Sequence, residues 1–380
     1  MTPLGASWHY ALIAGASLWV AAGTQGHADQ APSHATGETG SRPAVVAPTQ
    51  HAAAPSEAWL ADDHAPTWSP DGTRVAFVSD RDEPGNRDIY TAYTEGSAPV
   101  RVTTDASVDH QPAWSPDGRR IAFVSNRDGS YDWEIYVVDA DGGTPNNVTR
   151  HERGDQRPAW SPDGKRIAFE SNRAGHADVY VVDADGGEAT RLTRDGADDL
   201  RPQWSPDGES IAFTRGDIFV MDADGSGARN VTSTPGYHAD VAWSPDGRSI
   251  AFMSLTATPG NWDVGVVAVD GGPARRLTKD GGRDSRPVWS PDGGQIAFAS
   301  DRSGSPELFV MDADSGAPTR IAAQPLSADP FAWSPDGGRI AFASGTYGAR
   351  RILVVDADGG GLRALLSEDR DALSTVAAPK

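Results

Sequence analysis

Three histidines of this 380-residue chain lie just ahead of a recurring tryptophan, where their side chains could bind a metal or another ligand. His64 and His110 stand four residues before the Trp of a Trp-Ser-Pro-Asp-Gly string, and His238 stands five residues before another. Neutral imidazole binds transition metals and exchanges protons near neutral pH. No two of them have a local metal-ligand spacing, and irregular loops accept polar residues freely. A ligand site and ordinary loop residues therefore both stay open, and we assign no metal or cofactor.

Arginines and tryptophans occupy neighbouring stretches. Arg157, Arg201 and Arg286 each stand three residues before their Trp, where they would give a cationic spot suited to a carboxylate, a uronic acid or an anionic peptide terminus. Trp133 and Trp262 precede equivalent apolar runs, and exposed rings beside arginine suit a protein hot spot or a sugar-stacking platform. The alternatives are solvated loop arginines and aromatic rings that cap edges of the fold. We expect these five residues and the three histidines to form the binding surface.

Acidic and basic residues also recur together around the Trp. An Asp five residues before it accompanies an Arg about thirteen residues after it, and two repeats lack both, with His238 and Thr256 or Ala328 and Thr346 in their places. Joint presence and joint loss indicate paired charges, each worth about 1 kcal/mol or less if exposed. The predicted structural pairs are Asp63 with Arg81, Asp109 with Arg127, Asp155 with Arg173, Asp199 with Arg215, and Asp284 with Arg302.

The sequence lacks the residues that several kinds of catalysis require. The chain has no cysteine, which excludes thiol nucleophiles, thiolate metal sites and disulfides, and it contains no Gly-x-Ser-x-Gly string. No set of nucleophile, base and orienting group appears at a linear spacing, although residues from separate repeats can converge without leaving a motif. We therefore expect a protein that is not an enzyme.

A repeat of about 45 residues must position all of these side chains. Trp-Ser-Pro-Asp-Gly occurs seven times, and each copy continues with a β-branched residue, Ala and Phe, a loop, a second apolar run and an Asp-Gly turn. Four short antiparallel strands per unit, joined by such turns, describe a propeller blade. We predict an all-β, seven-bladed β-propeller with four antiparallel strands per blade over residues 57–370. The Trp and Phe of every repeat should be core, and the Asp residues of the turns structural rather than calcium ligands.

The net charge limits the kinds of partner that the protein can bind, and the N-terminal residues indicate its compartment. Lys and Arg number 33 against 53 for Asp and Glu, and the net charge of −20 argues against nucleic acid. An apolar run ahead of small residues near Ala28 predicts a signal peptide over residues 1–28, although no Lys or Arg precedes the run and an anchor is the alternative. Residues 29–56 are rich in Ala and Pro and predict a linker, and residues 371–380 a C-terminal tail. We expect no membrane span after cleavage, and a monomer.

The repeat resembles the TolB-type, WD-repeat-like propeller family, whose units share the Trp-Ser-Pro-Asp-Gly string, Ile-Ala-Phe, an Asn/Asp-Arg-Asp loop and an Asp-Ala-Asp-Gly-Gly turn. The resemblance covers about residues 59–367. It implies a periplasmic or secreted bacterial protein that binds an envelope protein or peptide, such as a peptidoglycan-associated lipoprotein. TolB itself carries an α/β domain before six blades, whereas seven repeats are present here.

Two functions follow from these observations. The first is a non-catalytic interaction or ligand-binding module that uses the irregular loop face and the channel mouth. The second is a metal-dependent, carbohydrate-acting propeller similar to polyuronate lyases, which predicts that His64, His110 or His238 converge on one ion. A structural or regulatory relative that senses peptidoglycan-bound material is a third possibility.

Overall fold

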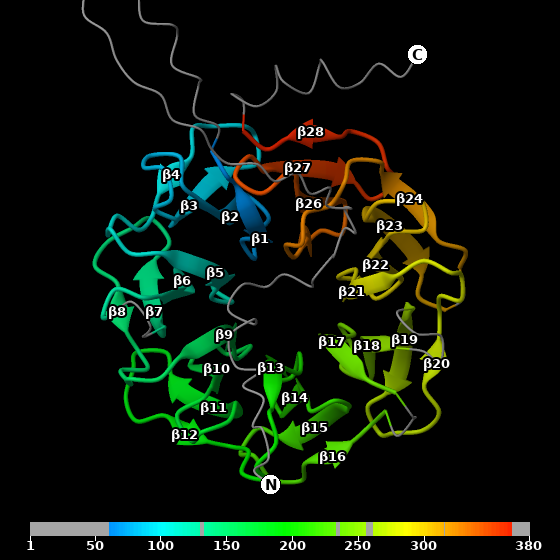
Figure 1. Cartoon of the computed structure of the whole chain (residues 1–380), viewed down its shortest axis with the longest axis horizontal. Helices are drawn as coiled ribbons and strands as arrows, with labels where there is room; N and C mark the ends of the chain where they lie inside the picture. The colour runs from blue at the N-terminus through cyan, green and yellow to red at the C-terminus, as the bar shows by residue number, and fades with distance from the viewer. Residues whose placement is uncertain (1–60, 130–132, 233–235, 256–260, 315, 367–380) are drawn as a thin grey trace, which may run out of the picture. The chain divides into compact units, whose positions relative to one another are not determined.

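The computed structural model describes residues 61–366 except 130–132, 233–235, 256–260 and 315. In these residues the chain forms seven four-stranded antiparallel sheets and no helix, arranged as the blades of a propeller (Figure 1). The predicted fold class is confirmed. The predicted signal peptide, linker and tail, together with Thr256, lie outside the described residues. No helix in the described part of the chain is long and apolar enough to cross a membrane.

Each blade is a meander in which consecutive strands pair, and the first strands lie toward the centre of the ring (Figure 1). They are β1 (His64–Trp68), β5 (Asp109–Trp114), β9 (Asp155–Trp160), β13 (Leu200–Trp204), β17 (His238–Trp243), β21 (Asp284–Trp289) and β25 (Ala332–Trp333). The second strands are β2 (Arg74–Ser79), β6 (Arg120–Ser125), β10 (Arg166–Ser171), β14 (Ser210–Thr214), β18 (Ser249–Leu255), β22 (Gln295–Ser300) and β26 (Arg339–Ser344).

The outer half of each of the first six blades has fewer strand residues than the inner half. The third strands are β3 (Asp88–Tyr93), β7 (Glu134–Asp139), β11 (Asp178–Asp183), β15 (Ile218–Asp222), β19 (Trp262–Ala268), β23 (Glu307–Asp312) and β27 (Arg351–Asp356). The rim strands are β4 (Val100–Arg101), β8 (Asn146–Asn147), β12 (Thr190–Arg191), β16 (Arg229–Asn230), β20 (Arg275–Arg276), β24 (Thr319–Ala322) and β28 (Arg363–Ala364). Most rim strands have only two residues, which leaves little free edge for another chain to pair with.

The core lies between neighbouring blades. The seven repeat Phe residues are at most 2% exposed, and each apolar cluster joins residues of two consecutive blades. Trp160, Trp243 and Trp289 are only partly buried, but all three pack against these clusters. Six of the seven indole N–H groups donate to a carbonyl of the preceding blade, at 3.0–3.2 Å. The same side chain thus fills the gap between blades and fixes their spacing.

The Trp-Ser-Pro-Asp-Gly turns are held by their own side chains. In the first blade Ser69 Oγ donates to Asp71 Oδ1 at 2.6 Å and accepts the Arg74 backbone N–H at 2.9 Å. Gly72 takes a left-handed φ of 70°, which Gly adopts without steric cost. The hydrogen bonds from Ser69 and Thr73 hold the pKa of Asp71 below its usual value. These contacts give the turn aspartates the structural role that the sequence predicts.

The first strand of six blades carries a bulge. The residue three positions before the Trp has φ between 53° and 58°, in the left-handed region that residues other than Gly rarely adopt. The pairing with the second strand shifts at the same place in each blade. The seventh blade has Pro330 at this position, whose ring holds φ negative, and its first strand is reduced to Ala332–Trp333. The six residues are Ala65, Gln111, Arg157, Arg201, Asp240 and Arg286.

Within residues 61–366, the ring closes without exchange of a strand. All four strands of the last blade come from the end of the repeat region, in the order β25-β26-β27-β28. Between the last and first blades, an apolar cluster packs Trp68 and Phe77 against Ile352 and Leu365. The Trp68 indole N–H also donates to the Ala332 carbonyl at 3.0 Å. The junction therefore repeats the packing found between the other blades.

Candidate functional site

The candidate site is a ring of side chains where the first strands begin, on the face of the irregular connections. We call it the mouth ring, and it comprises the residues three and four positions before each repeat Trp. The first set is Ala65, Gln111, Arg157, Arg201, Asp240, Arg286 and Pro330, and the second is His64, His110, Gln156, Leu200, Ala239, Ser285 and Asp329. The bulge recurs even at Ala65, so it belongs to the architecture of the blade. What differs between blades is the side chain that the bulge presents.

Glu170 of blade three joins blades three and four, and Gln111 joins blades two and three. Glu170 Oε1 accepts from Arg157 Nε at 3.0 Å, and its Oε2 accepts from the backbone N–H of Arg201 at 3.0 Å. The backbone N–H of Arg157 donates in turn to Gln111 Oε1 at 2.8 Å. Glu170 is only 14% exposed, and its two carboxylate oxygens are held by Arg157 and Arg201. This carboxylate orients one mouth arginine by its side chain and the next by its backbone.

The chain of contacts continues across blades five, six and seven. The Arg201 guanidinium forms an ion pair with Asp240 of the next blade. Arg286 Nη1 donates to the backbone carbonyls of Asp329 at 2.9 Å and of Ser327 at 3.5 Å. Asp240 and Asp329 both act electrostatically on Arg286, which places the three groups in one neighbourhood.

His64 completes the ring between blades seven and one. Its Nδ1 lies 3.3 Å from Asp329 Oδ1, while its Nε2 is buried and has no hydrogen-bond partner among the described residues. Burial alone would raise the pKa of Asp329, but the contact with His64 and the charge of Arg350 outweigh burial and hold that pKa well below its usual range. Asp329 therefore stays ionised and can orient the imidazole.

His110 lies one blade further on and packs against Trp133. The two ring centroids are 4.5 Å apart, and Trp133 itself packs against the apolar cluster between blades two and three. Burial, with smaller effects from His64, Arg87 and Arg157, lowers the pKa of His110 to about 3. His110 is therefore neutral at physiological pH.

His238 does not join the other two histidines in the mouth ring. It takes the position that Asp holds in most blades, where it is 1% exposed and its ring meets Phe252 edge-on at 5.1 Å. Its Nε2 lies 3.7 Å from Asp217 Oδ1 of the preceding blade. The spacing of one residue explains the difference, because consecutive strand residues face opposite sides of a sheet. We therefore interpret His238 as a core residue of its blade.

The other two histidines of the described residues lie elsewhere on the same face. His176 Nδ1 is 3.2 Å from Asp178 Oδ2, and His151 belongs to the pocket described below. Among the described residues, no group of three or more His, Asp or Glu side chains is arranged to hold a metal ion. The convergence of His64, His110 and His238 that a metal site would require is not found there.

The predicted Asp and Arg partners all form ion pairs. The N–O distances are 2.8 Å for Asp63 with Arg81, 3.0 Å for Asp109 with Arg127, 2.8 Å for Asp155 with Arg173, 2.6 Å for Asp199 with Arg215, and 3.0 Å for Asp284 with Arg302. Their aspartates are at most 2% exposed, so the energy expected of exposed pairs does not apply to them. Each guanidinium also lies over the Phe of its own blade, at 5.2–5.5 Å.

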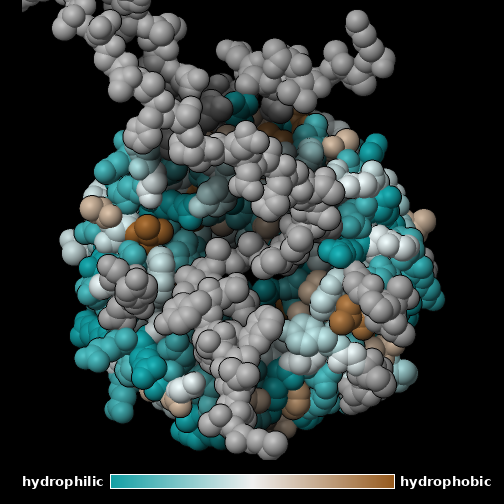
Figure 2. All heavy atoms as spheres, viewed as in Figure 1, coloured by the Kyte–Doolittle hydropathy of each residue, from teal (hydrophilic) through white to brown (hydrophobic). Residues whose placement is uncertain are grey.

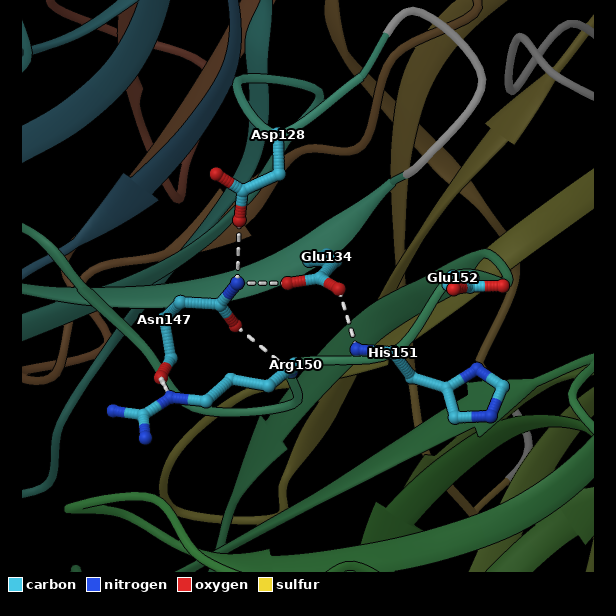
Figure 3. Close-up of a pocket in the computed structure, with 6 residues that line it drawn as sticks. All are labelled: Asp128, Glu134, Asn147, Arg150, His151 and Glu152. Atoms are coloured by element: carbon cyan, nitrogen blue, oxygen red, sulfur yellow. Dashed lines mark hydrogen bonds between the residues drawn. The ribbon is translucent and has the colours of Figure 1, made fainter.

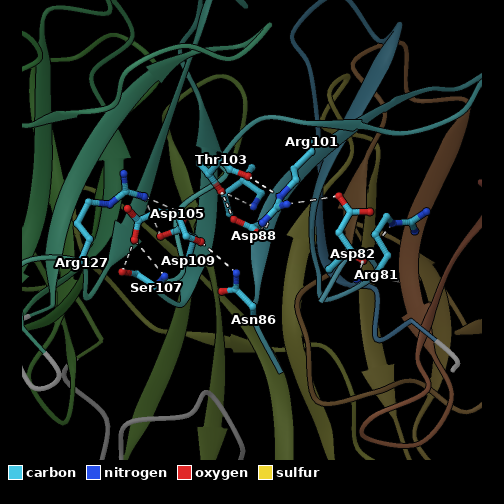
Figure 4. A network of polar contacts seen from close by, with 12 residues as sticks. Arg81, Asp82, Asn86, Asp88, Arg101, Thr103, Asp105, Ser107, Asp109 and Arg127 are labelled. Atoms are coloured by element: carbon cyan, nitrogen blue, oxygen red, sulfur yellow. Dashed lines mark hydrogen bonds and ion pairs between the residues drawn. The ribbon is translucent and has the colours of Figure 1, made fainter. Parts of the chain in front are cut away.

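A second polar layer surrounds these pairs (Figure 4). Asp88 pairs with Arg101 of the rim strand at 2.6 Å and accepts from Thr103 Oγ1 at 3.1 Å. The same Thr oxygen accepts the Ile89 backbone N–H at 3.0 Å. Asp178 with Arg191, Asp263 with Arg276 and Glu307 with Arg320 repeat this arrangement in other blades. Most charges of the irregular face thus hold strands together.

One open pocket lies at the outer part of blade two (Figure 3). Asn147 lies at its centre, where its amide nitrogen donates to Asp128 at 2.8 Å and to Glu134, and its carbonyl oxygen accepts the Arg150 backbone N–H at 3.0 Å. His151 donates its backbone N–H to Glu134. The polar groups therefore bond mainly to one another and stabilise the loop at residues 147–151.

Trp262 packs beside an exposed aromatic residue. Its ring meets Tyr237 edge-on at 5.9 Å, and Tyr237 is 45% exposed. Elsewhere, the face seen in Figure 2 is mainly hydrophilic, with isolated apolar spots among the described residues.

Glu170, Asp240 and Asp329 were missed by the sequence analysis. Glu170 stands ten residues after its Trp, where the other blades have Val, Thr, Met or Ala. A position-by-position comparison of the seven repeats would have identified it as the one acidic residue at an otherwise uncharged position. Asp240 and Asp329 were hidden because their contacts cross from one blade to the next.

The comparisons with known proteins agree on the fold. The TolB beta propeller domain model matches residues 55–151, 130–217 and 216–379. An oligogalacturonate lyase solved in complex with manganese has a TM-score of 0.65 and 18% identity, covering 78% of this chain and 90% of that one. A puromycin-hydrolysing peptidase from Mycobacterium tuberculosis has a TM-score of 0.65 and 16% identity, covering 81% and 53%. TolB from Acinetobacter baumannii has a TM-score of 0.50 and 22% identity, covering 80% and 65%. Comparison with curated proteins gives no match.

Proposed function

Because the chain belongs to the TolB β-propeller family, we propose that it is a non-catalytic binding module whose ligand docks on the irregular face over the channel mouth. The observation that carries this proposal is the mouth ring. Arg157, Arg201 and Arg286 are presented by left-handed backbone in blades three, four and six, and the side chains of Arg201 and Arg286 link their blades to the next ones.

The arrangement of the mouth ring suits binding of a ligand rather than catalysis. Several of its polar groups bond to one another, as in Arg157 with Glu170 and Arg201 with Asp240, and such networks rigidify a surface before a partner arrives. The buried polar layer behind it, exemplified by Asp109 with Arg127, gives the loops a fixed base. A preorganised polar surface suits recognition of a folded or extended polypeptide.

The proposed partner is an envelope protein or peptide, such as a peptidoglycan-associated lipoprotein, met in the periplasm or outside the cell. The signal-like segment over residues 1–28 supports export, and the net charge of −20 disfavours nucleic acid. We propose a monomer, because the rim strands are too short to pair with a second ring.

A metal-dependent, carbohydrate-acting propeller is the second candidate. It is supported by the fold shared with an oligogalacturonate lyase that binds manganese. A peptidase has the same TM-score to this chain as the lyase has, so the similarity to the lyase shows the fold alone. The two candidates differ in whether binding depends on a metal.

The test is affinity capture from envelope extract of the source organism with the purified full chain, read by mass spectrometry with and without a chelator. Arg157→Gln on the mouth ring is compared with Arg229→Gln on the exposed rim strand, which removes the same charge elsewhere. We expect a chelator-insensitive protein whose recovery falls with Arg157→Gln and not with Arg229→Gln. Equal loss in both variants, or recovery of glycan in a chelator-sensitive manner, would overturn the proposal.

A further inference from the structure

The three arginines of the mouth ring are compensated unequally. Arg157 has Glu170 at 3.0 Å, and Arg201 pairs with Asp240. Arg286 has no carboxylate oxygen within 4.0 Å of its guanidinium in the described part of the chain. Its acceptors there are the neutral backbone carbonyls of Asp329 and Ser327. Arg286 is therefore the mouth arginine that lacks a counter-ion.

The carboxylates nearest to Arg286 are already engaged. Asp240 is paired with Arg201, and Asp329 is paired with Arg350 at 2.6 Å and contacts His64 at 3.3 Å. Arg286 is half-buried, and burial lowers its pKa, although a guanidinium remains charged at neutral pH. A partly desolvated cation without a counter-ion is costly, and an incoming anion would remove that cost.

A second unused donor lies beside it. His64 is 9% exposed at its side chain, and its Nε2 is buried without a hydrogen-bond partner among the described residues. His64 and Arg286 both contact Asp329, the first at the carboxylate and the second at the backbone carbonyl. Asp329 thus holds an imidazole and a guanidinium in one neighbourhood, each with hydrogen-bonding capacity that the protein leaves unused.

We propose that Arg286 and His64 form a carboxylate-binding subsite of the mouth ring, and that its occupant is a carboxylate of a polypeptide. The inference rests on the proposed function and deepens it by naming the chemical group that is recognised. Guanidinium binds carboxylate through two parallel hydrogen bonds, and imidazole can supply one more. A sugar acid is less suited, because Trp133 is packed against His110 and the core rather than open as a platform for a sugar ring.

The test is isothermal titration calorimetry of the full chain with two forms of one peptide. The first is N-acetyl-Ala-Ala-Ala with a free C-terminal carboxylate, and the second is the same peptide with a C-terminal amide. N-acetyl-Asp amide tests a side-chain carboxylate, and digalacturonate tests a sugar acid. We expect either peptide carboxylate to bind at least about tenfold more tightly than the amide, and Arg286→Gln to remove the difference. Arg229→Gln, which removes an exposed rim charge, should leave it unchanged.

Equal binding of the acid and amide forms, absence of binding by every probe, or a preference for digalacturonate would overturn the subsite. The comparison of acid with amide uses the unaltered chain, so it remains decisive even if Arg286→Gln folds poorly. A chain that captures its partner through the irregular face but treats the two peptide forms alike keeps the proposed function and loses this subsite. A chain that shows neither property loses both.

Discussion

Arg350 and Asp62, separated by 288 positions in the chain, form the ion pair that joins the last blade to the first. The guanidinium donates to both carboxylate oxygens, at 2.7 and 2.5 Å, and the Arg350 backbone N–H donates to the same carboxylate at 3.1 Å. Arg350 also pairs with Asp329, so ring closure and the mouth ring share one cation. Both residues of the pair are at most 7% exposed. Closure without an exchanged strand therefore depends on buried charge as well as on apolar packing.

Removal of one partner at the ring closure should be strongly destabilising. Arg350→Ala leaves the Asp62 carboxylate buried and uncompensated, so we expect the free energy of unfolding to fall by about 3–5 kcal/mol. Chemical denaturation measures the change. Lys165→Ala is the control, because its pair with Asp163 is at 3.7 Å and both side chains are more than half exposed, which predicts a loss of about 1 kcal/mol or less. Similar losses in the two variants would show that the closure does not depend on this pair.

The same pair should make stability depend on pH in the acid range. Burial alone would raise the pKa of Asp62, but the hydrogen bonds and charge of Arg350 outweigh burial and hold that pKa below 3.8. The folded state then binds the proton more weakly than the unfolded chain, so this stabilisation is complete above about pH 4 and is lost as pH falls further. We expect the melting temperature of Asp62→Asn to fall less steeply with decreasing pH below about pH 4 than that of the unaltered chain. Parallel curves for the two proteins would contradict the assignment.

The repeated Asp and Arg pairs should be coupled more strongly than exposed pairs. Asp155 is 0% exposed and lies 2.8 Å from Arg173, whose guanidinium also lies over Phe169. Asp155→Ala removes the partner of the stacked Arg173 cation, and Arg173→Ala leaves a buried carboxylate without its partner. We therefore expect a coupling energy of about 1–3 kcal/mol in the double-mutant cycle of these two substitutions. Urea unfolding of the four proteins measures it. Additive losses would mean that the two residues stabilise the blade independently.

Much of this arrangement follows from the repeat itself. The seven tryptophans of the Trp-Ser-Pro-Asp-Gly strings give the number of blades, and joint loss of Asp and Arg in two repeats gives the pairs, because both features lie within one unit. The mouth ring could not be predicted in the same way. The contacts from Arg201 to Asp240 and from His64 to Asp329 join different blades, and the bulge that turns Arg157 into the mouth is a backbone property without a distinctive residue. His238 was misplaced for a related reason, since one residue of register separates the core from the mouth.

Gly265 should be required for the packing of the fifth blade. It takes the place that an aromatic residue holds in most blades, and a Cβ at this position would lie 2.9 Å from the Phe252 ring, which also contacts His238. We expect Gly265→Ala to lower the free energy of unfolding by about 1–3 kcal/mol through overpacking. Gly281→Ala is the matched control, because nothing lies within 4 Å of its Cβ position. A thermal melt in which both variants match the unaltered chain would show that Phe252 can move aside at little cost.

Glu170 separates the stability of the propeller from its proposed binding function. Blades one and two have Val78 and Val124 at the equivalent position, both fully buried, so the fold accepts Val there. Glu170→Val should change the free energy of unfolding by no more than about 1 kcal/mol, because the lost polar contacts are offset by apolar burial.

The same substitution removes the acceptor that holds Arg157 Nε and the Arg201 backbone N–H. The Arg157 guanidinium then loses its fixed orientation, so its ordering cost on binding rises by about 0.5–1.5 kcal/mol, and Arg201 loses the acceptor of its backbone N–H while its guanidinium keeps Asp240. We expect partner capture by Glu170→Val to weaken by about tenfold while its melting curve stays close to that of the unaltered chain. Glu170→Gln, which keeps one carbonyl acceptor, should recover part of the binding. Full capture by Glu170→Val would show that Glu170 only fills space in the strand, whereas a large loss of stability would show that its role is structural.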